Sequence, residues 1–278
     1  MSVRRERMDM DASREPGASI AISAVPNLRD LGGWPTKGGG RVRWGLVYRS
    51  TALDRLEGAD MATFAALGIR SVYDLRTKGE RAAQPDCLPP GTEYVVLDVI
   101  KDSAVAAPAK LLDVRSDPKA AEEMLGGGKG EPLFENGYRE IVSLPSACAA
   151  YHRLFMELTQ DEHRPALFHC TTGKDRTGWA AASLLLLLGV PDDLVMQEYL
   201  LTNKQLLPAE KPVLDHFRAL GGDPDTLLSV VAVAPEYLEA ALAEMSKEFG
   251  TVERYFTEGL GIDEGAQKAL RAALVEHF

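Results

Sequence analysis

The first hundred residues alternate between short apolar runs and polar turns rich in glycine and proline. Residues 44–48, 70–75 and 93–99 are rich in Val, Leu and Tyr, which is typical of buried strands. Residues 59–67 have the spacing of a short amphipathic helix that Gly68 ends. This alternation predicts an α/β fold with a central, mostly parallel sheet flanked by helices.

A further strand and helix follow each other in the middle of the chain. The apolar run at 165–168 is typical of a buried strand. The Ala- and Leu-rich run at 179–188 is typical of a helix, with Gly189 and Pro191 as its stop. The polar segment 169–178 connects the two, so that a cysteine follows the strand and an arginine precedes the helix.

Most of the chain beyond residue 134, apart from this strand, has helical apolar spacing. We therefore expect a helical C-terminal half and no second sheet. The expected helices lie at 134–144, 147–159, 191–202, 209–220, 235–248, 252–257 and 263–277.

The N-terminus and one internal segment differ from this pattern. Residues 1–17 are charged and lack an apolar cluster, so we expect a flexible tail followed by a single domain at 18–278. Within that domain, segment 101–145 is predicted to be an inserted lid, with helical patches at 104–113 and 118–125. The alternative to a lid is an ordinary surface loop without a function, because long insertions in compact domains are either functional or disordered.

The composition is that of an ordinary globular protein with an acidic balance. The 278 residues carry a net charge of −10, which argues against general nucleic-acid binding because that needs a basic face. Three cysteines, at positions 87, 148 and 170, are too few for a disulfide framework, and neither they nor the five histidines show metal-ligand spacing. We therefore expect a reducing compartment and no metal or other cofactor.

The sequence shows no targeting or membrane-spanning pattern. The N-terminal tail has no apolar stretch typical of a signal peptide. The longest apolar run, 179–188, is about half of the roughly 20 residues that a spanning helix needs. We expect a cytoplasmic protein without stable membrane insertion, while export by an unusual route and the oligomeric state stay open.

The segment between the central strand and helix has the make-up of an anion-binding loop. A loop that closes onto a helix N-terminus directs several backbone N–H groups at one point, where the helix dipole favours negative charge. Arg176 adds a planar fork of donors that suits two oxygens of a tetrahedral anion. The same field is expected to lower the pKa of Cys170 and make it a nucleophile. The alternative, a buried cysteine without chemistry, leaves the neighbouring Lys174 and Asp175 unexplained.

The residues of this loop resemble a known signature. His169-Cys170, five further residues and Arg176-Thr177-Gly178 resemble the signature loop of the cysteine-based protein tyrosine phosphatase superfamily. The full string HCTTGKDRTG is similar to that of the PtpB/LipA-like branch of bacterial tyrosine and dual-specificity phosphatases. The resemblance spans about residues 20–275 and includes 27–33 (NLRDLGG), 48–53 (YRSTAL), 72–76 (VYDLR), 199–203 (YLLTN) and 249–255 (FGTVERY).

The resemblance implies a phosphatase that works through a phosphocysteine intermediate. Its substrates would be phosphotyrosine and, in addition, phosphoserine, phosphothreonine or phosphoinositide monoesters. A binding module without turnover, or another thiolate enzyme such as a sulfurtransferase, is the alternative. The phosphate would be held by the loop residues Thr171, Thr172, Gly173, Lys174, Asp175 and Arg176.

The leaving oxygen of such a reaction needs a proton from a carboxyl group within hydrogen-bond reach. Asp175 is the first candidate, as the resemblance also implies, although it could instead shape the loop by accepting backbone N–H bonds. Asp98 and Asp102, at the end of the third expected strand, are the alternatives.

Other residues are expected to support the loop. His169 is expected to orient the nucleophile, with a core histidine as the alternative, and Thr177 to donate to the thiolate or cap the helix. Lys174 suggests substrates with more than one phosphate, unless it is simply solvated. The resemblance further implies that Asp74, Arg76 and Arg49 brace the loop and that Tyr138 and Asn203 line the substrate groove.

Overall fold

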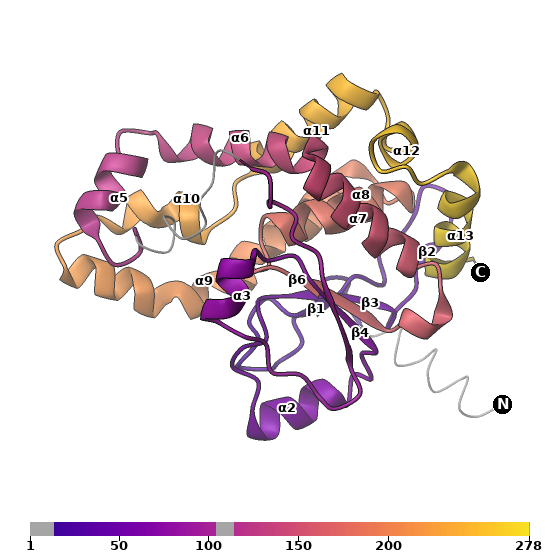
Figure 1. Ribbon diagram of the computed structural model, residues 1–278, viewed down its shortest axis with the longest axis horizontal. Coiled ribbons are helices and arrows are strands. Elements are labelled where there is room, and N and C mark those ends of the chain that lie inside the picture. The colour runs from indigo at the N-terminus through magenta and orange to yellow at the C-terminus, as the bar shows by residue number, and fades with distance from the viewer. Residues whose placement is uncertain (1–13, 104–113, 278) are drawn as a thin grey trace.

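A computed structural model describes residues 14–103 and 114–277 of the chain. Its centre is a five-stranded sheet with the order β1-β3-β6-β4-β5 (Figure 1). In that order the strands are β1 (Arg29–Asp30), β3 (Val47–Ser50), β6 (Ala166–His169), β4 (Ser71–Asp74) and β5 (Glu93–Val96). Four of these strands are parallel, and the edge strand β1 runs antiparallel to β3. The expected mostly parallel α/β sheet is confirmed.

The register of the parallel strands brings their carboxyl ends to one edge of the sheet. Ser50, His169, Asp74 and Val96 form one row of paired residues across β3, β6, β4 and β5. Every residue of β3, β6 and β4 is buried, as is usual for parallel strands that are covered on both faces. Residues that follow this row lie at the crevice where open α/β sheets bind their ligands.

Helices cover both faces of the sheet and make up most of the C-terminal half. They are α2 (Gly58–Ala65), α3 (Lys78–Ala83), α5 (Pro118–Leu125), α6 (Gly130–Ser143), α7 (Pro145–Glu157), α8 (Arg176–Leu187), α9 (Asp192–Ala219), α10 (Leu228–Val231), α11 (Pro235–Phe249), α12 (Val252–Arg254) and α13 (Glu264–Leu274). Shorter turns are η1 (Asp161–His163), η2 (Pro224–Leu227) and the π-helical η3 (Tyr255–Gly259). Figure 1 shows α2 on one face of the sheet and α7 and α8 on the other.

An apolar core lies on each face. The smaller core, under α2, includes Phe64 and Leu167, and the larger core includes Phe155 and Trp179. Nearly every residue of α8 is buried, so its Ala and Leu residues pack on all sides rather than along one stripe. This packing fixes the N-terminus of α8 directly after the loop that leaves β6.

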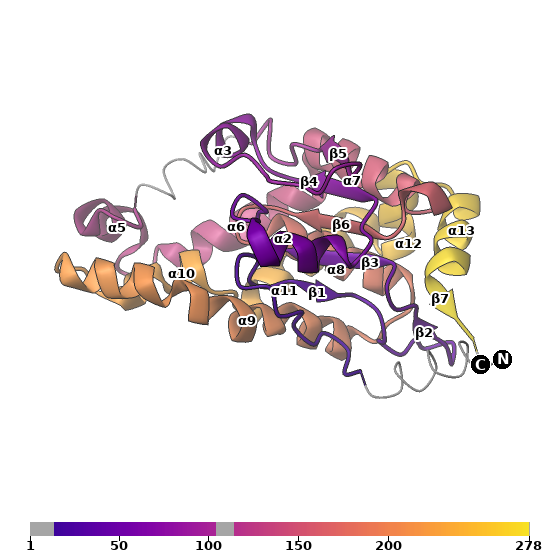
Figure 2. The ribbon, with the colours of Figure 1, turned by 90° about the horizontal axis from the view of Figure 1, so that it is seen from below.

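The segment expected to form a lid contributes α5 and α6 to a helical extension at one side of the sheet. Figures 1 and 2 both show α5, α10 and the far end of α9 grouped away from the strands. The helical patch expected at 118–125 is confirmed by α5. The patch expected at 104–113 lies outside the described residues.

The expectation of two separate helices at 191–202 and 209–220 is wrong. The structure has one continuous helix, α9, with Pro208 and Pro212 inside it. A proline inside a helix removes a backbone hydrogen bond and costs about 3 kcal/mol, which makes it a reasonable sign of a helix end. Here the packing of α9 against α8, η2 and α11 outweighs that cost.

The expectation of no second sheet is also wrong. β2 (Arg41–Val42) and β7 (Val275–Glu276) pair antiparallel, so the helix expected at 263–277 ends as α13 at Leu274. Both valines are buried, and Arg41 forms an ion pair with Glu276. Strands of two residues are too short to show alternation in a sequence.

One stretch of the described residues is long and apolar enough, by length and composition alone, to cross a membrane. It is Pro224–Phe249, whose most apolar window has a mean hydropathy of 1.4. In the structure this stretch comprises η2, α10 and α11, and 44% of the window is buried inside the protein. Core helices of soluble proteins pass the same test, so the finding is weak evidence for membrane contact.

Candidate active site

Cys170 lies at the carboxyl edge of the sheet, directly after the central strand. β6 has β3 on one side and β4 on the other, and α8 begins at Arg176. Within the connecting loop, Gly173 has a φ of 66°, and a Cβ there would lie 2.2 Å from the Ser50 carbonyl oxygen. The loop therefore packs so closely on the end of β3 that only glycine fits at this position.

The surroundings of Cys170 favour its thiolate. Burial is the largest single influence and acts to raise the pKa of the thiol, but the Arg176 guanidinium and hydrogen bonding from Thr177 together outweigh it. The pKa of Cys170 is therefore lowered below its ordinary value. The Thr177 hydroxyl is buried and has no hydrogen-bond partner in the described part of the chain, which leaves it available to the sulfur.

Arg176 is held by a carboxylate from helix α3. Glu80 accepts two hydrogen bonds from the Arg176 guanidinium, at 2.7 and 2.8 Å, and a third from the Thr171 hydroxyl. Burial acts to raise the pKa of Glu80, but Arg176 and the other donors lower it to about 2. The guanidinium is thus fixed as a planar fork at the start of α8.

Helix α3 is not among the helices expected from the sequence, although a signal was present. The Thr77 hydroxyl accepts from the Glu80 backbone, and the Glu80 carboxylate accepts from the Thr77 backbone, which is the capping box of a Thr-x-x-Glu pattern. With only six residues, Gly79 among them, α3 shows no apolar periodicity. One carboxylate therefore both caps this helix and binds Arg176.

A buried ionic cluster braces the other side of the loop. The Gly173 carbonyl oxygen accepts hydrogen bonds from the Asn27 amide at 3.0 Å and from the Arg49 guanidinium at 2.6 Å. Arg49 and Arg29 both pair with Glu198 of α9, at 2.8 and 2.6 Å, and all three side chains are at most 1% exposed. Arg49 therefore braces the loop as expected, whereas sequence reasoning did not identify its partner on α9.

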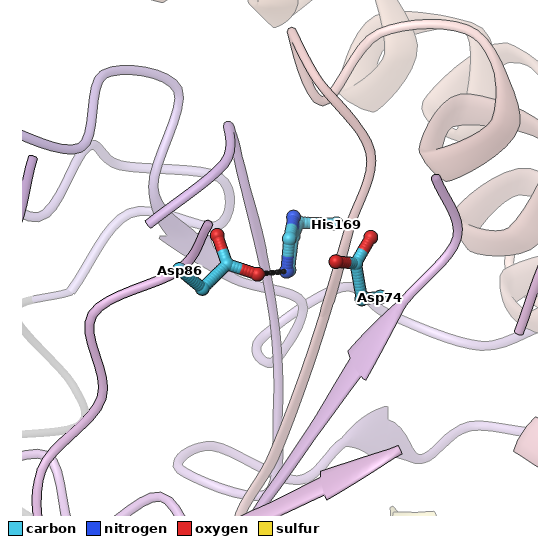
Figure 3. A group of neighbouring side chains, drawn as sticks. All are labelled: Asp74, Asp86 and His169. Atoms are coloured by element: carbon cyan, nitrogen blue, oxygen red, sulfur yellow. Dashed lines mark ion pairs between the residues drawn. The ribbon is translucent and has the colours of Figure 1, made fainter. Parts of the chain in front are cut away.

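His169 lies between Asp74 and Asp86 in a buried cluster (Figure 3). Its Nδ1 donates to the Cys170 carbonyl oxygen at 3.0 Å, and its Nε2 lies 3.2 Å from Asp86, an ion-pair distance without hydrogen-bond geometry. Burial acts to lower the pKa of His169, but the two carboxylates outweigh it and the pKa is raised. These contacts fix the backbone of Cys170, and an orienting role in catalysis stays a prediction.

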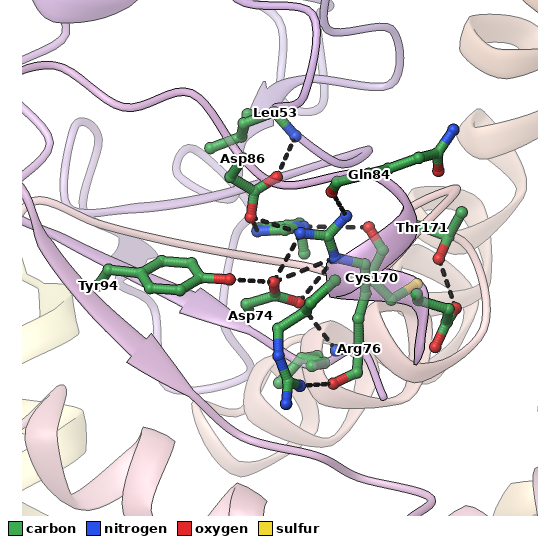
Figure 4. A network of polar contacts seen from close by, with 12 residues as sticks. Leu53, Asp74, Arg76, Gln84, Asp86, Tyr94, Cys170 and Thr171 are labelled. Carbon is green, nitrogen blue, oxygen red and sulfur yellow. Dashed lines mark hydrogen bonds and ion pairs between the residues drawn. The ribbon is translucent and has the colours of Figure 1, made fainter. Parts of the chain in front are cut away.

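The ligand atoms of these three side chains lie within 4.8 Å of one another, as in a metal site. However, the Arg76 guanidinium already donates to both Asp74 and Asp86, at 2.7 Å each (Figure 4). Burial acts to raise the pKa of Asp74, but Arg76 and His169 outweigh it and lower the pKa. The cluster therefore contains its own cation, and it braces the end of β4 beside the loop.

Lys174 is buried and reaches the C-terminal helices. Its side chain is 2% exposed, and its ammonium donates to the carbonyl oxygens of Ser229 and Ala232 at 3.2 and 3.1 Å. The ammonium also lies over the Phe134 ring, 4.3 Å from the ring centre. The alternative of a solvated lysine is therefore wrong, and a contact with a second phosphate stays a prediction.

Asp175 is tied to its neighbours through one carboxylate oxygen. Oδ1 lies 3.0 Å from the Lys174 ammonium and accepts a hydrogen bond from the Tyr138 hydroxyl, also at 3.0 Å. The Tyr199 hydroxyl donates in turn to Tyr138 at 2.7 Å. Tyr138 thus binds the loop with a side chain that is 1% exposed, and the groove-lining role that the resemblance implies for it stays a prediction.

Three other residues that were expected near the site make contacts outside the loop or have an unpaired oxygen. Asn203 binds both backbone groups of Val233 at 2.8 Å, which makes it a clamp on α9. Asp102 is exposed and accepts from the Ser146 backbone at 3.1 Å, at the start of α7. Asp98 follows β5 and has one buried carboxylate oxygen with no hydrogen-bond partner among the described residues.

Comparison with known proteins agrees with this geometry. The chain matches the tyrosine phosphatase family over residues 20–276. The protein belongs to that family. This phosphatase is 27% identical over 282 residues to the triple specificity protein phosphatase PtpB of Mycobacterium tuberculosis, with 92% of this chain and 100% of PtpB covered.

Two further relatives carry tyrosine phosphatase names. A Cupriavidus necator protein with a provisional tyrosine-protein phosphatase name is 31% identical over 253 residues, with 91% of this chain and 88% of that protein covered. A tyrosine-protein phosphatase of Nostoc commune is 30% identical over 157 residues, with 54% and 46% covered. The chain is therefore a bacterial-type, PtpB-like protein tyrosine phosphatase.

A cavity of about 130 Å³ opens beside the signature loop of the phosphatase, at Thr171 and Thr172. Its other walls come from residues before β1, the segment after β3, Gln84 after α3, the residues before α5, and α9. They include Arg55, after β3, and Arg115, before α5. The Arg55 side chain is 78% exposed, and Arg115 pairs with Glu210. The phosphate loop therefore borders a polar hollow with two guanidinium groups.

We expect iodoacetate to modify Cys170 of the phosphatase selectively at about pH 6. Because the pKa of Cys170 is lowered, its thiolate persists as the pH falls below the usual thiol pKa, whereas burial raises the pKa of Cys148 and keeps that thiol protonated. Mass spectrometry should place the label on Cys170, and inorganic phosphate should protect it. Labelling of Cys170 that begins only above about pH 8 would contradict the lowered pKa.

Replacement of Glu198 by alanine is expected to reduce the free energy of unfolding by about 3–5 kcal/mol. The change leaves the buried guanidinium groups of Arg29 and Arg49 without their carboxylate. Urea denaturation measures the effect. The matched control is Glu258→Ala, which removes an exposed pair with Arg254 and should leave the free energy of unfolding close to that of the wild type. Equal effects of the two substitutions would show that the buried cluster does not brace the fold.

Proposed function

We propose that this phosphatase hydrolyses phosphotyrosine monoesters and also accepts phosphoserine, phosphothreonine or phosphoinositide monoesters. The observation that carries the proposal is a cysteine of lowered pKa at a helix N-terminus, beside a guanidinium that Glu80 holds in a planar pair. The triple specificity in the name of the M. tuberculosis relative supports the broader substrate range.

In the proposed reaction the backbone N–H groups of residues 171–176 and the Arg176 fork hold the phosphate. The Cys170 thiolate attacks phosphorus, the bond from phosphorus to the ester oxygen breaks, and that oxygen takes a proton from a carboxyl group. Water then attacks the phosphocysteine and gives its proton to the same carboxylate. Inorganic phosphate leaves, and hydrogen bonding from Thr177 stabilises the restored thiolate.

The cavity beside the loop supports a substrate that extends beyond its phosphate. Arg55 is the exposed cation of its wall, whereas the Lys174 ammonium is engaged by backbone carbonyl groups. An acidic peptide flank or a second phosphate on an inositol ring would each suit an exposed guanidinium. Both fall within the proposed range of substrates.

Hydrolysis of p-nitrophenyl phosphate tests the proposed function. Turnover should survive EDTA, because a thiolate nucleophile needs no metal, and vanadate should inhibit it by occupying the anion loop. A panel of phosphopeptides and phosphoinositides then ranks the substrate classes. Turnover that requires an added metal would overturn the thiolate mechanism, and binding of phosphopeptides without turnover would favour the binding-module alternative.

A further inference from the structure

We propose that Asn27 is a positioning residue that sets the direction of the phosphate-binding N–H groups in the signature loop. The proposal rests on the proposed function, and it concerns a side chain that lies outside the loop, two residues before β1. It follows from which polar groups of the loop backbone have partners in the protein and which have none.

Three successive carbonyl groups of the loop are held by the first 52 residues of the chain. The Thr171 oxygen accepts the Ala52 backbone N–H at 3.1 Å. The Asn27 amide nitrogen donates to the next two oxygens, those of Thr172 and Gly173, at 3.3 and 3.0 Å. One side chain therefore fixes the direction of two neighbouring peptide units.

The N–H groups of these peptide units point the opposite way. In a planar trans peptide the C=O and N–H bonds are antiparallel, so the bound carbonyls direct the N–H groups of Thr172, Gly173 and Lys174 away from Asn27. None of the three N–H groups donates a hydrogen bond within the described residues. Gly173 and Lys174 are buried, where an unpaired N–H is rare. With Gly173 in the left-handed conformation, these donors have the arrangement of an anion-binding nest.

The direction of the Asn27 amide is fixed at both ends. Its oxygen accepts a hydrogen bond from the Arg29 guanidinium, which has only donors. The loop carbonyls have only acceptors, so the NH₂ group has to face them. Glu198 and Thr202 of α9 hold Arg29 in turn. The amide therefore cannot turn over without the loss of a hydrogen bond at each end.

The backbone of Asn27 is also unusual. Its φ of 62° is the one positive value at a non-glycine position among the described residues. Asparagine enters this left-handed region more readily than most residues, but it does so at some cost. Such conformations persist where the surrounding contacts require them, often at functional sites. Asn27 is 1% exposed, and the contacts that require this conformation are those with Arg29 and the loop.

The role of Asn27 can be separated from that of Arg176 and Thr177. Those two residues begin α8, and they lower the pKa of Cys170. Asn27 acts on peptide units that precede α8, so its loss should weaken anion binding and leave the ionisation of Cys170 unchanged. A general loosening of the loop would change both properties.

The test replaces Asn27 by glycine, which accepts the same backbone conformation but has no amide side chain. The inhibition constant of vanadate should rise by about tenfold or more, and kcat/KM for p-nitrophenyl phosphate should fall by a similar factor. The pH dependence of Cys170 modification by iodoacetate should stay that of the wild-type enzyme. An inhibition constant does not depend on how much of a variant is folded, so a folding defect cannot imitate the result.

Thr202→Val is the matched control, because it removes a hydrogen bond to Arg29 from the same buried cluster without touching the loop. It should leave the vanadate inhibition constant unchanged. Asn27→Asp keeps the left-handed backbone and the bond from Arg29 but presents an acceptor to the loop carbonyls. Its inhibition constant should rise at least as much as that of Asn27→Gly.

Wild-type affinity for vanadate in either variant of Asn27 would overturn the assignment. Equal losses in Asn27→Gly and Thr202→Val would also overturn it, as would a rise in the pKa of Cys170 that accompanies the loss of vanadate affinity in Asn27→Gly. If the wild-type enzyme does not hydrolyse p-nitrophenyl phosphate, the proposed function fails instead.

Discussion

Replacement of Cys170 by serine should reduce the hydrolysis of p-nitrophenyl phosphate by about 10⁵-fold or more, as is typical when a covalent nucleophile is removed. A serine hydroxyl does not ionise near neutral pH, so Arg176 and Thr177, which lower the pKa of Cys170, cannot activate it. Initial rates at saturating substrate measure the loss. The anion loop itself keeps its backbone N–H groups and its guanidinium, so vanadate should still bind the variant.

Cys87→Ser is the matched control for this substitution. Cys87 is exposed, and its thiol meets the Asp54 carbonyl oxygen rather than the phosphate loop. Its replacement should leave both rate and vanadate affinity close to those of the wild-type enzyme. More than about one per cent residual activity in Cys170→Ser would show that the sulfur is not the nucleophile.

Replacement of Arg176 by lysine should lower kcat/KM by about 10³-fold, a loss typical when a preorganised oxyanion donor is removed. Lysine keeps the charge but not the planar fork, and it cannot form the bidentate pair with Glu80. Steady-state kinetics and vanadate inhibition measure the two consequences. Both the rate and the affinity for vanadate should fall, because the same fork binds substrate and transition state.

An exposed arginine provides the control for Arg176→Lys. Arg254 pairs with Glu258 and is 60% exposed, and Arg254→Lys should leave kcat/KM unchanged. A loss of less than tenfold in Arg176→Lys would mean that charge alone, rather than the geometry of the guanidinium, holds the phosphate.

The parts of the site that could be predicted from the sequence are those that are local in the chain. The strand, the loop with Cys170 and Arg176, and the following helix lie within one stretch, and apolar runs mark both ends of the loop. The parallel sheet was predictable for a similar reason, since its strands are separate apolar runs between turns. The chemistry of the loop followed from residue types that a plain strand-to-helix connection does not need.

The partners of the loop could not be predicted because they come from distant elements. Nothing near Arg49 indicates that its carboxylate is Glu198, and nothing near Lys174 indicates that it ends over Phe134 and between carbonyl groups of α10 and the turn after it. The capping box at Thr77 and Glu80 was readable, but only the fold shows that the same carboxylate binds Arg176. In helix α9 a local signal was present but misleading. Its two prolines would end an isolated helix, but tertiary packing overrides them.

The brace on Gly173 has a consequence for how the enzyme gains activity. Asn27 precedes Gly173 by 146 residues, and the glutamate that holds the two arginines lies further on, in α9. When residues 169–178 of a nascent chain have just left the ribosome exit tunnel, Glu198 is still inside the tunnel and cannot pair with the two arginines. Contacts between such distant segments form slowly, so turnover should be among the last native properties to return on refolding, well after the helices have regained their circular dichroism.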